Sequence, residues 1–198
     1  MSSTRRQIEI AALRLLEKDG AGAVSMRRVA QAVGLTPMAI YHHFKNRAEL
    51  LDRVVATEFS ALEEAMTSKR LTGSLERRIM AALDIYVLYA LERPRVFDYL
   101  FSEARSGARR YPEDFRAGRS PTLNRFASLL AEGIAAGELR SGDRWELAMH
   151  LWAQVHGFVM LFRAGRFDLT QPEFINLVRR SIKRLLHGLA VPDSRAAR

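Results

Sequence analysis

The sequence predicts an all-α protein with two parts, a small amino-terminal head of three helices and a larger helical domain that follows it. Three observations lead to this prediction. Apolar residues recur every three or four positions through most of the 198 residues, which is the spacing of one helix face. Ser, Thr and Asn stand before these segments, and Gly or Pro stands after them, as expected at helix ends. No internal repeat or low-complexity tract interrupts the pattern.

The first helix is predicted from Thr4 to Gly20. Thr4 and Gln7 have the spacing of a capping box, and Gly20 suits the left-handed residue that ends a helix. Two basic residues, Arg5 and Arg6, lie at its start. Its inward face is formed by apolar residues at helical spacing, namely Ile8, Ala11, Ala12, Leu15 and Leu16.

Residues 25–45 are the most informative segment of the head. Ser25 is placed to cap a short helix, and Gly34 follows that helix as the left-handed residue of a tight turn. Ala30 is small where two helices would cross. The apolar face of this short helix comprises Met26, Val29, Ala30 and Val33.

A second short helix is expected directly after the turn. Thr36 can accept hydrogen bonds from its first-turn amides, and Pro37 suits its first position. Ile40 and Phe44 lie one turn apart on the buried side. The residues left pointing outward are Met38, Ala39, Tyr41, His42 and Lys45.

This arrangement is a helix-turn-helix, and its outward face has the chemistry of a DNA-binding surface. Hydroxyl, imidazole and ammonium groups can reach phosphates, while a small, apolar first turn lets the backbone approach base edges and thymine methyl groups. A plain helical hairpin with a polar outer face is the alternative interpretation of the same pattern.

The run TPMAIYHHFKNRAELL, residues 36–51, resembles the signature of the TetR family of dimeric transcriptional regulators. In that family the recognition helix ends in Tyr, a polar residue, a variable residue, Phe and Lys, which are residues 41–45 here. The resemblance extends back over the first helix and covers about a quarter of the chain. It implies a helix-turn-helix DNA-binding domain at 4–45 and a helical regulatory and dimerisation domain at 46–190.

The resemblance assigns DNA contacts to the head. Tyr41, His42 and Lys45 are expected to hold the DNA backbone, and Thr36, Met38 and Ala39 to approach bases. Arg5 and Arg6 are either phosphate contacts or solvated terminal charges. The full expected set of DNA-binding residues is Arg27, Thr36, Pro37, Met38, Ala39, Tyr41, His42 and Lys45.

A long helix is predicted at about 47–66, and it connects the head to the remainder of the chain. Asn46 and Glu49 have the spacing of a capping box. Further helices are expected at 74–91, 94–103 and 121–136, with a loop at 106–121. The inner stripe of the connecting helix comprises Leu51, Val55, Phe59, Leu62 and Met66.

Aromatic and methionine side chains in the helical domain predict a pocket for a small, largely apolar or aromatic effector. Ordinary core packing is the alternative for each of them. The candidate ligand-binding residues are Tyr86, Tyr89, Phe97, Phe101, Trp145, Met149, Trp152 and Met160.

Residues 147–162 contain no Asp, Glu, Lys or Arg, so this helix is predicted to be covered on every side, with a second subunit over one face. A helix at 172–186, capped by Thr170 and Glu173, carries another apolar stripe. Together they predict a four-helix homodimer interface. His156 is interpreted as a hydrogen-bonded core or interface residue rather than as a ligand. The predicted interface residues are Trp152, His156, Gly157, Leu177, Val178, Ile182 and Leu185, and the first three, with Phe162 and Gly165, also resemble the regulatory domain of one TetR branch.

The composition fits a DNA-binding protein. The net charge is +9, and residues 1–45 hold seven Lys or Arg against three Asp or Glu. There is no cysteine, no signal-peptide core and no apolar run long enough for a bilayer, so a cytoplasmic protein is expected. Catalytic motifs and metal-ligand spacings are lacking, so no enzyme activity, cofactor or metal is expected.

The predicted function is repression from a palindromic, double-stranded DNA operator, relieved by a small-molecule effector. The competing interpretation is an interaction protein that uses its two carboxy-terminal helices.

Overall fold

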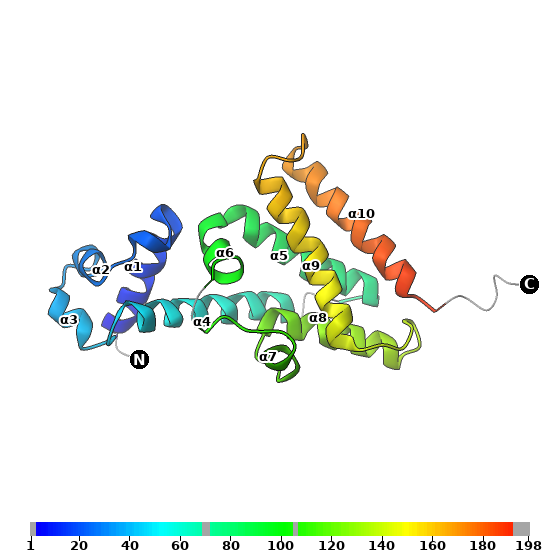
Figure 1. Cartoon of the computed structure of the whole chain (residues 1–198), viewed down its shortest axis with the longest axis horizontal. Helices are drawn as coiled ribbons and strands as arrows, with labels where there is room; N and C mark the ends of the chain where they lie inside the picture. The colour runs from blue at the N-terminus through cyan, green and yellow to red at the C-terminus, as the bar shows by residue number, and fades with distance from the viewer. Residues whose placement is uncertain (1–2, 69–71, 105–106, 192–198) are drawn as a thin grey trace, which may run out of the picture. The chain divides into compact units, whose positions relative to one another are not determined.

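The computed structural model describes residues 3–68, 72–104 and 107–191. Within these ranges the chain forms ten α-helices, one 3-10 turn (η1, Ala21–Ala23) and no strand, only an isolated bridge between Leu139 and Ala190 (Figure 1). The all-α prediction is confirmed. The α-helices are α1 (Ser3–Asp19), α2 (Met26–Ala32), α3 (Pro37–Tyr41), α4 (Arg47–Thr67), α5 (Leu75–Glu92), α6 (Pro94–Phe101), α7 (Glu113–Arg116), α8 (Pro121–Ala135), α9 (Arg144–Arg163) and α10 (Gln171–Leu189).

The helices form two compact units. The first unit comprises the described residues within 1–61 and 92–106, and the second comprises those within 62–91 and 107–198. The predicted helix-turn-helix segment, 4–45, lies inside the first unit. That unit also includes most of α4 and all of α6, so the structure divides the chain differently from the predicted boundary at residue 46.

Ion pairs explain why α6 belongs to the first unit. Arg93, just before α6, pairs with Glu17 of α1 and with Glu58 of α4. Arg95 donates to the carbonyl oxygen of Lys18 at the end of α1. These partners lie more than thirty residues apart from α6 in sequence, so helical periodicity alone does not reveal them.

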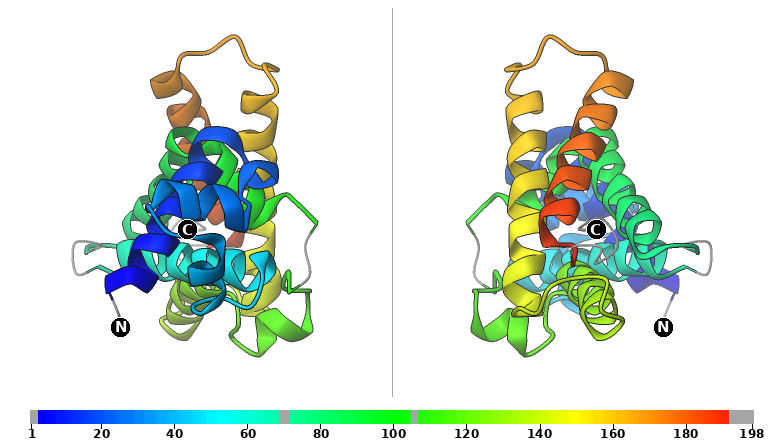
Figure 2. Two further views of the ribbon diagram at one scale, coloured as in Figure 1. Left: turned by 90° about the vertical axis from the view of Figure 1, so that its left-hand side faces the viewer. Right: turned by 90° about the vertical axis from the view of Figure 1, so that its right-hand side faces the viewer.

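The second unit is built from α5 and α7–α10, together with the last residues of α4. In Figure 2, α9 and α10 run side by side, and α8 packs against α9. Gly133 of α8 is a point of close approach, since a Cβ there would lie 2.3 Å from Leu75 Cδ2. The end of α10 is fastened by the Arg140 amide, which donates to the Leu189 carbonyl oxygen at 2.8 Å.

Several helix boundaries differ from those predicted. The first helix already begins at Ser3, so Thr4 lies inside it and does not act as its cap. The helix that contains the uncharged residues 147–162 begins at Arg144 because Asp143 caps it, accepting from the amides of Trp145 and Glu146. The predicted loop at 106–121 contains the short helix α7, and residue 106 lies outside the described residues.

Residues 147–162 were expected to be covered on every side with a second subunit over one face; the protomer itself covers only one face, and the second subunit stays a prediction. Four residues of α9 are buried, at the spacing of one helix face: Ala148, Leu151, Val155 and Val159. The opposite face includes the exposed residues Ala153, Met160 and Leu161. Among the described residues no helix is both long and apolar enough to cross a membrane.

Candidate functional site

The turn between α2 and α3 sets the direction of the recognition helix. Gly34 has φ +69°, the left-handed region, and the Leu35 amide donates to the Ala30 carbonyl oxygen at 2.9 Å. Ser25 caps α2 by accepting from the Arg28 amide. Thr36 caps α3 by accepting from the Ala39 amide at 3.3 Å. The local signals in the sequence therefore form the turn as predicted.

The recognition helix is held from below by two fully buried side chains, Ile40 and Phe44. Above Phe44, the Arg5 guanidinium lies 4.8 Å from the ring centroid. Such a contact fixes one basic side chain at the start of α1 over the core of the head. Arg5 also lies 3.8 Å from Glu9, so this residue stabilises the first unit.

The outward side of α3 is left uncovered by the protomer. The helix ends at Tyr41, so Phe44 and Lys45 follow it and are not part of the recognition helix, in contrast to the prediction. The predicted DNA-contacting residues at 36–45 therefore belong to α3, its two cap residues and the segment after it. Exposed there are Thr36, Pro37, Met38, Tyr41, His42 and Lys45, while Ala39 is half-buried.

The two arginines at the start of α2 are in different situations. Arg28 is held within the unit, donating to Asp19 at 2.6 Å and to the Ala23 carbonyl oxygen at 3.2 Å. Arg27 is exposed and has no ion pair with any described residue. Of the two, Arg27 has the guanidinium that is available to a phosphate.

Arg47 is a positioning residue that the sequence did not single out. Its Nε donates to the Val24 carbonyl oxygen at 2.6 Å, and its terminal nitrogen donates to the Ala21 carbonyl oxygen. Since Arg47 is the first residue of α4, these bonds join α4 to the segment before α2. The sequence does not predict these hydrogen bonds, because one arginine at the start of a helix is not part of any recognisable motif.

The aromatic residues of the second unit centre on Tyr86, which is fully buried. Its hydroxyl oxygen accepts from Trp152 Nε1 at 2.9 Å and lies 3.0 Å from His156 Nδ1. Because an indole nitrogen can only donate, the hydroxyl hydrogen of Tyr86 remains available to His156. Burial raises the pKa of Tyr86, and the smaller opposing effect is the hydrogen bond from Trp152, so the phenol stays protonated.

The eight candidate ligand-binding residues do not all lie in one unit. Phe97 is fully buried in the first unit, 4.9 Å from the Phe101 ring, which in turn lies 5.3 Å from Phe59. The other six belong to the second unit: Tyr86, Tyr89, Trp145, Met149, Trp152 and Met160. Of these six, Trp152 donates a hydrogen bond to Tyr86, whereas Met160 lies on the exposed side of α9.

The predicted dimer residues divide into core and accessible positions. Val178 and Ile182 are 2% and 0% exposed, so the protomer's own core covers them and the structure corrects their assignment to an intersubunit face. Leu177 and Leu185 are half-buried, as are Trp152, His156 and Gly157. The apolar stripe predicted on α10 is present, but most of it faces the core of the protomer.

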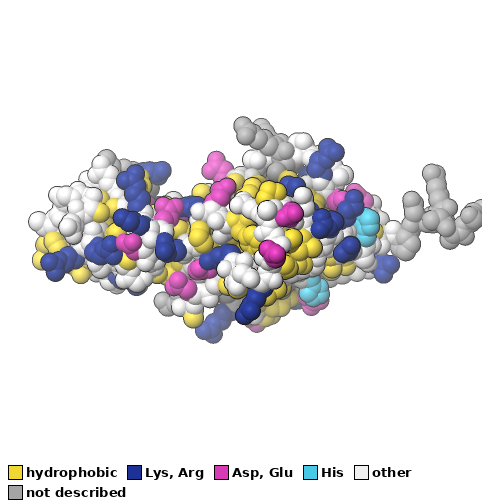
Figure 3. Space-filling model, turned by 90° about the horizontal axis from the view of Figure 1, so that it is seen from above, with side chains coloured by type: hydrophobic (Ala, Val, Ile, Leu, Met, Phe, Trp, Pro, Cys, Tyr) yellow, Lys and Arg dark blue, Asp and Glu magenta, His cyan; other side chains and the backbone are white. Residues whose placement is uncertain are grey.

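The accessible face of α9 and α10 contains small and apolar residues. A Cβ added at Gly157 or at Gly188 would meet no atom within 4 Å, so there is open space beside both. Gln154 Nε2 donates to Ser181 Oγ at 2.6 Å and fastens the two helices side by side. Figure 3 shows hydrophobic side chains gathered on one face of this unit, among Lys and Arg.

Comparisons with known protein families fit this geometry. The family model described as "Bacterial regulatory proteins, tetR family" matches residues 10–54, which contain the helix-turn-helix and the start of α4. The model described as "Tetracyclin repressor-like, C-terminal domain" matches residues 79–189, more than half of the chain. The chain belongs to the TetR family.

Relatives of this TetR-family chain are found along most of its length. It is 33% identical over 160 residues to the class A tetracycline repressor protein of transposon 1721 from Escherichia coli, covering 80% of this chain and 66% of that protein. It is 26% identical over 171 residues to the nucleoid occlusion factor SlmA of Marinobacter nauticus, covering 84% of this chain and 83% of that protein.

A solved structure shows the same fold. A Rhodococcus protein of unknown function superposes with a TM-score of 0.80 and 26% identity, covering 96% of this TetR-family chain and 97% of that one. TetR-family regulators are DNA-binding transcriptional regulators and often repressors, which agrees with the exposed recognition helix found here. The finer likeness of Trp152, His156 and Gly157 to one branch of the family stays a prediction.

Proposed function

We propose that this TetR-family protein is a homodimeric repressor that binds a palindromic operator through α3 and is released by a small, largely apolar or aromatic effector. The observation that carries the proposal is the exposed surface formed by α3 and the residues that flank it, Thr36, His42 and Lys45. Beneath this surface the side chains of Ile40 and Phe44 are fully buried. A surface of this kind is free to enter a DNA major groove while the helix beneath stays fixed.

Each head contributes two classes of contact in this proposal. Tyr41, His42 and Lys45 hold phosphates, and Arg27 adds a further guanidinium at the start of α2. Thr36, Met38 and Ala39 approach base edges, with Met38 and the Ala39 methyl group suited to thymine methyl groups. Pro37 contributes by starting the helix without an amide that would need a partner.

Dimerisation is proposed through the accessible face of α9 and α10. Gly157 and Gly188 allow two copies to approach closely, and Leu161 and Leu177 supply apolar area around them. Two-fold symmetry then presents two copies of α3 to a palindrome, with half-sites about 34–36 Å apart or somewhat more.

The effector is proposed to bind near Tyr86. The ring of Trp152 and the side chains of Tyr89 and Met149 provide apolar area, while the Tyr86 and His156 pair provides a polar contact. An effector lowers operator affinity only if it binds more tightly to a conformation whose recognition helices no longer match the half-site spacing.

The proposal is tested by selecting genomic fragments with the purified protein near physiological salt and excess competitor DNA. A shared palindrome among the recovered fragments supports a sequence-specific dimeric regulator. Recovery that is sequence-independent, and equal for the Tyr41→Phe, Lys45→Ala double variant, contradicts it. Once an operator is known, effector candidates are added and the loss of binding is scored.

A further inference from the structure

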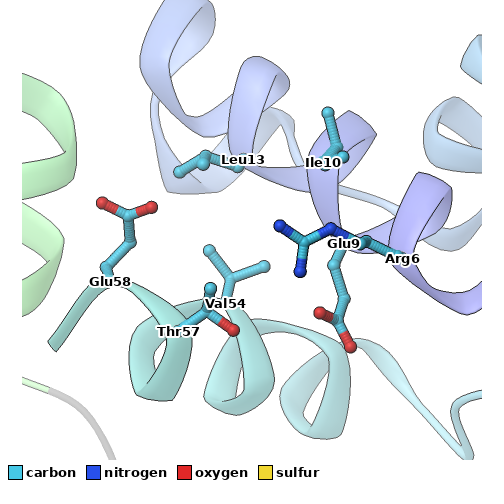
Figure 4. A pocket seen from close by; sticks show the side chains of 7 residues that line it. All are labelled: Arg6, Glu9, Ile10, Leu13, Val54, Thr57 and Glu58. Carbon is cyan, nitrogen blue, oxygen red and sulfur yellow. The ribbon is translucent and has the colours of Figure 1, made fainter. Parts of the chain in front are cut away.

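A pocket of about 180 Å³ lies between α1 and α4 of the first unit (Figure 4). Its apolar wall is formed by Ile10 and Leu13 from α1 and Val54 from α4. Glu9 and Glu58 lie at its sides, and Arg6 extends from α1 into the space between the two helices. The pocket shares no lining residue with the α3 face or with Tyr86, Trp152 and His156.

Both carboxylates of this pocket already have cationic partners. Glu9 is 7% exposed and accepts from Arg53 Nε at 3.3 Å, with Arg5 3.8 Å away. Glu58 is 5% exposed and pairs with Arg93. Buried carboxylates that are neutralised in this way do not attract a further cation, since it would have to displace an arginine.

Arg6 differs from the other charged groups around the pocket. Among the described residues it has no ion pair or hydrogen-bond partner, although its guanidinium carries five donors. The surrounding charge also favours an anion. The pocket lining and its direct ion-pair partners hold four guanidiniums, of Arg5, Arg6, Arg53 and Arg93, against two carboxylates, of Glu9 and Glu58. Arg93 pairs in addition with Glu17, which leaves one guanidinium in excess.

We propose that this pocket binds a small amphipathic carboxylate. Its carboxylate group pairs with the Arg6 guanidinium, which has the planar geometry for two parallel hydrogen bonds. Its apolar body covers Ile10, Leu13 and Val54. The size fits, because an apolar cavity of about 150 Å³ holds one benzene ring, so this pocket admits a single ring on a short chain.

The charge and the apolar wall together distinguish this ligand from a DNA phosphate. A phosphodiester at Arg6 would leave the three apolar side chains in contact with water, whereas an arylalkyl carboxylate covers them. The site lies in the unit that contains the recognition helix, but the inference does not depend on the proposed repressor function, since binding is measured without DNA.

The test is isothermal titration calorimetry of the full-length protein with 3-phenylpropionate, in parallel with 3-phenylpropionamide, which is uncharged, and with inorganic phosphate. We expect saturable binding of the carboxylate and binding at least about tenfold weaker for the amide, because the amide loses the charge-assisted hydrogen bonds. Equal affinities for carboxylate and amide, or no binding of the carboxylate, overturn the proposal. Phosphate binding as tightly as the carboxylate also overturns it, because the apolar wall would then contribute nothing.

Two variants locate the site, and a third is their control. Arg6→Gln removes the cation and is expected to weaken carboxylate binding at least about tenfold while leaving amide binding unchanged. Leu13→Trp fills the pocket and should abolish binding of both. Arg14→Gln removes an exposed arginine of the same helix and should change neither. If Arg6→Gln binds the carboxylate as the unchanged protein does, the ligand sits elsewhere, for example near Tyr86, and the proposal fails.

Discussion

The faces of α3 and α9 that the protomer leaves uncovered are built from different residues. On α3 and the residues that flank it, Tyr41, His42 and Lys45 are exposed beside one exposed methionine, Met38, and two buried side chains, Ile40 and Phe44, hold the helix from beneath. On α9, the corresponding residues are Ala, Gly, Met and Leu together with one exposed histidine, His150, and the buried side belongs to a helix of twenty residues. The difference fits the two partners proposed above, DNA for the first face and a second copy of the protein for the second.

The largest expected effect is at the α9 face. Gly157→Glu should convert the dimer into a monomer, because two carboxylates would meet across the two-fold axis in an apolar interface. Since no atom lies near Gly157 within the protomer, the fold itself should tolerate the change. Sedimentation velocity measures the dimer, and operator affinity should fall by about 100-fold when the two heads are no longer joined.

Ala135→Glu is the matched control for that experiment, since it places the same charge at an exposed residue at the end of α8. It should sediment as a dimer. If Gly157→Glu sediments as a dimer too, the proposed interface is on the wrong surface.

The α3 face should show a smaller effect that depends on salt. Tyr41→Phe with Lys45→Ala is expected to weaken operator binding by about tenfold and to leave the dimer intact. The slope of log affinity against log salt should become shallower by about 2, because each of two heads loses one cation at a phosphate. Lys18→Ala removes an exposed lysine from the end of α1, and an equal change of slope in that variant would contradict a specific role for Lys45.

Substitution of the buried Tyr86 should affect stability rather than oligomeric state. Tyr86→Phe should lower the free energy of unfolding by about 1–2 kcal/mol, because Trp152 and His156 lose a shared partner. Urea unfolding followed by circular dichroism measures this difference, and the dimer should persist. An unchanged midpoint would show that the Tyr86 hydroxyl contributes nothing to the core.

Tyr86 also predicts a dependence on alkaline pH. Its pKa is raised in the folded state by burial, while in the unfolded chain it is about 10. The unfolded state therefore loses the proton first, and stability should be constant below about pH 10 and fall above it, by at most about 1.4 kcal/mol per pH unit from this residue. Tyr86→Phe should show a correspondingly shallower fall.

The smallest expected effect concerns the start of α9. Hydrogen bonds from the Trp145 and Glu146 amides lower the pKa of Asp143, and the nearby Arg116 lowers it further, with desolvation opposing. A lowered pKa stabilises the fold above the unfolded value of about 3.9 and loses that contribution as pH falls through the folded one. Asp143→Ala should therefore reduce Tm slightly at pH 7, and the difference should shrink below about pH 4. A difference that is independent of pH would exclude the ionised cap.

The turn of the head was predictable because its signals are local, although the equally local Thr4 signal failed, since α1 begins one residue earlier, at Ser3. Ser25 and Thr36 each accept a hydrogen bond from an amide three residues later, and Gly34 adopts the positive φ that the turn requires. All three behave as the sequence indicates. The capping box of Thr170 and Glu173 at the start of α10 is confirmed for the same reason. Short-range hydrogen bonding leaves little choice of partner.

The α10 stripe, the Arg47 and Arg93 contacts and the pocket beside Arg6 were less predictable, because the residues that they contact are distant in sequence. Periodicity places Val178 and Ile182 on one stripe of α10, but it does not say whether the protomer or a partner covers that stripe. In the same way, Arg47 and Arg93 look like ordinary surface charges until the segments they join are folded together. The pocket beside Arg6 depends on where α4 passes α1, which no local pattern specifies.

The most direct test of the central claim is a hydroxyl-radical footprint of the protein on a selected operator. If a two-fold dimer reads DNA with α3, two protected windows should lie symmetrically about the centre of the palindrome, on one face of the duplex and about one helical turn or somewhat more apart. Lys45→Ala should weaken both windows equally. A single window, or protection without symmetry, would contradict the dimeric mode of recognition.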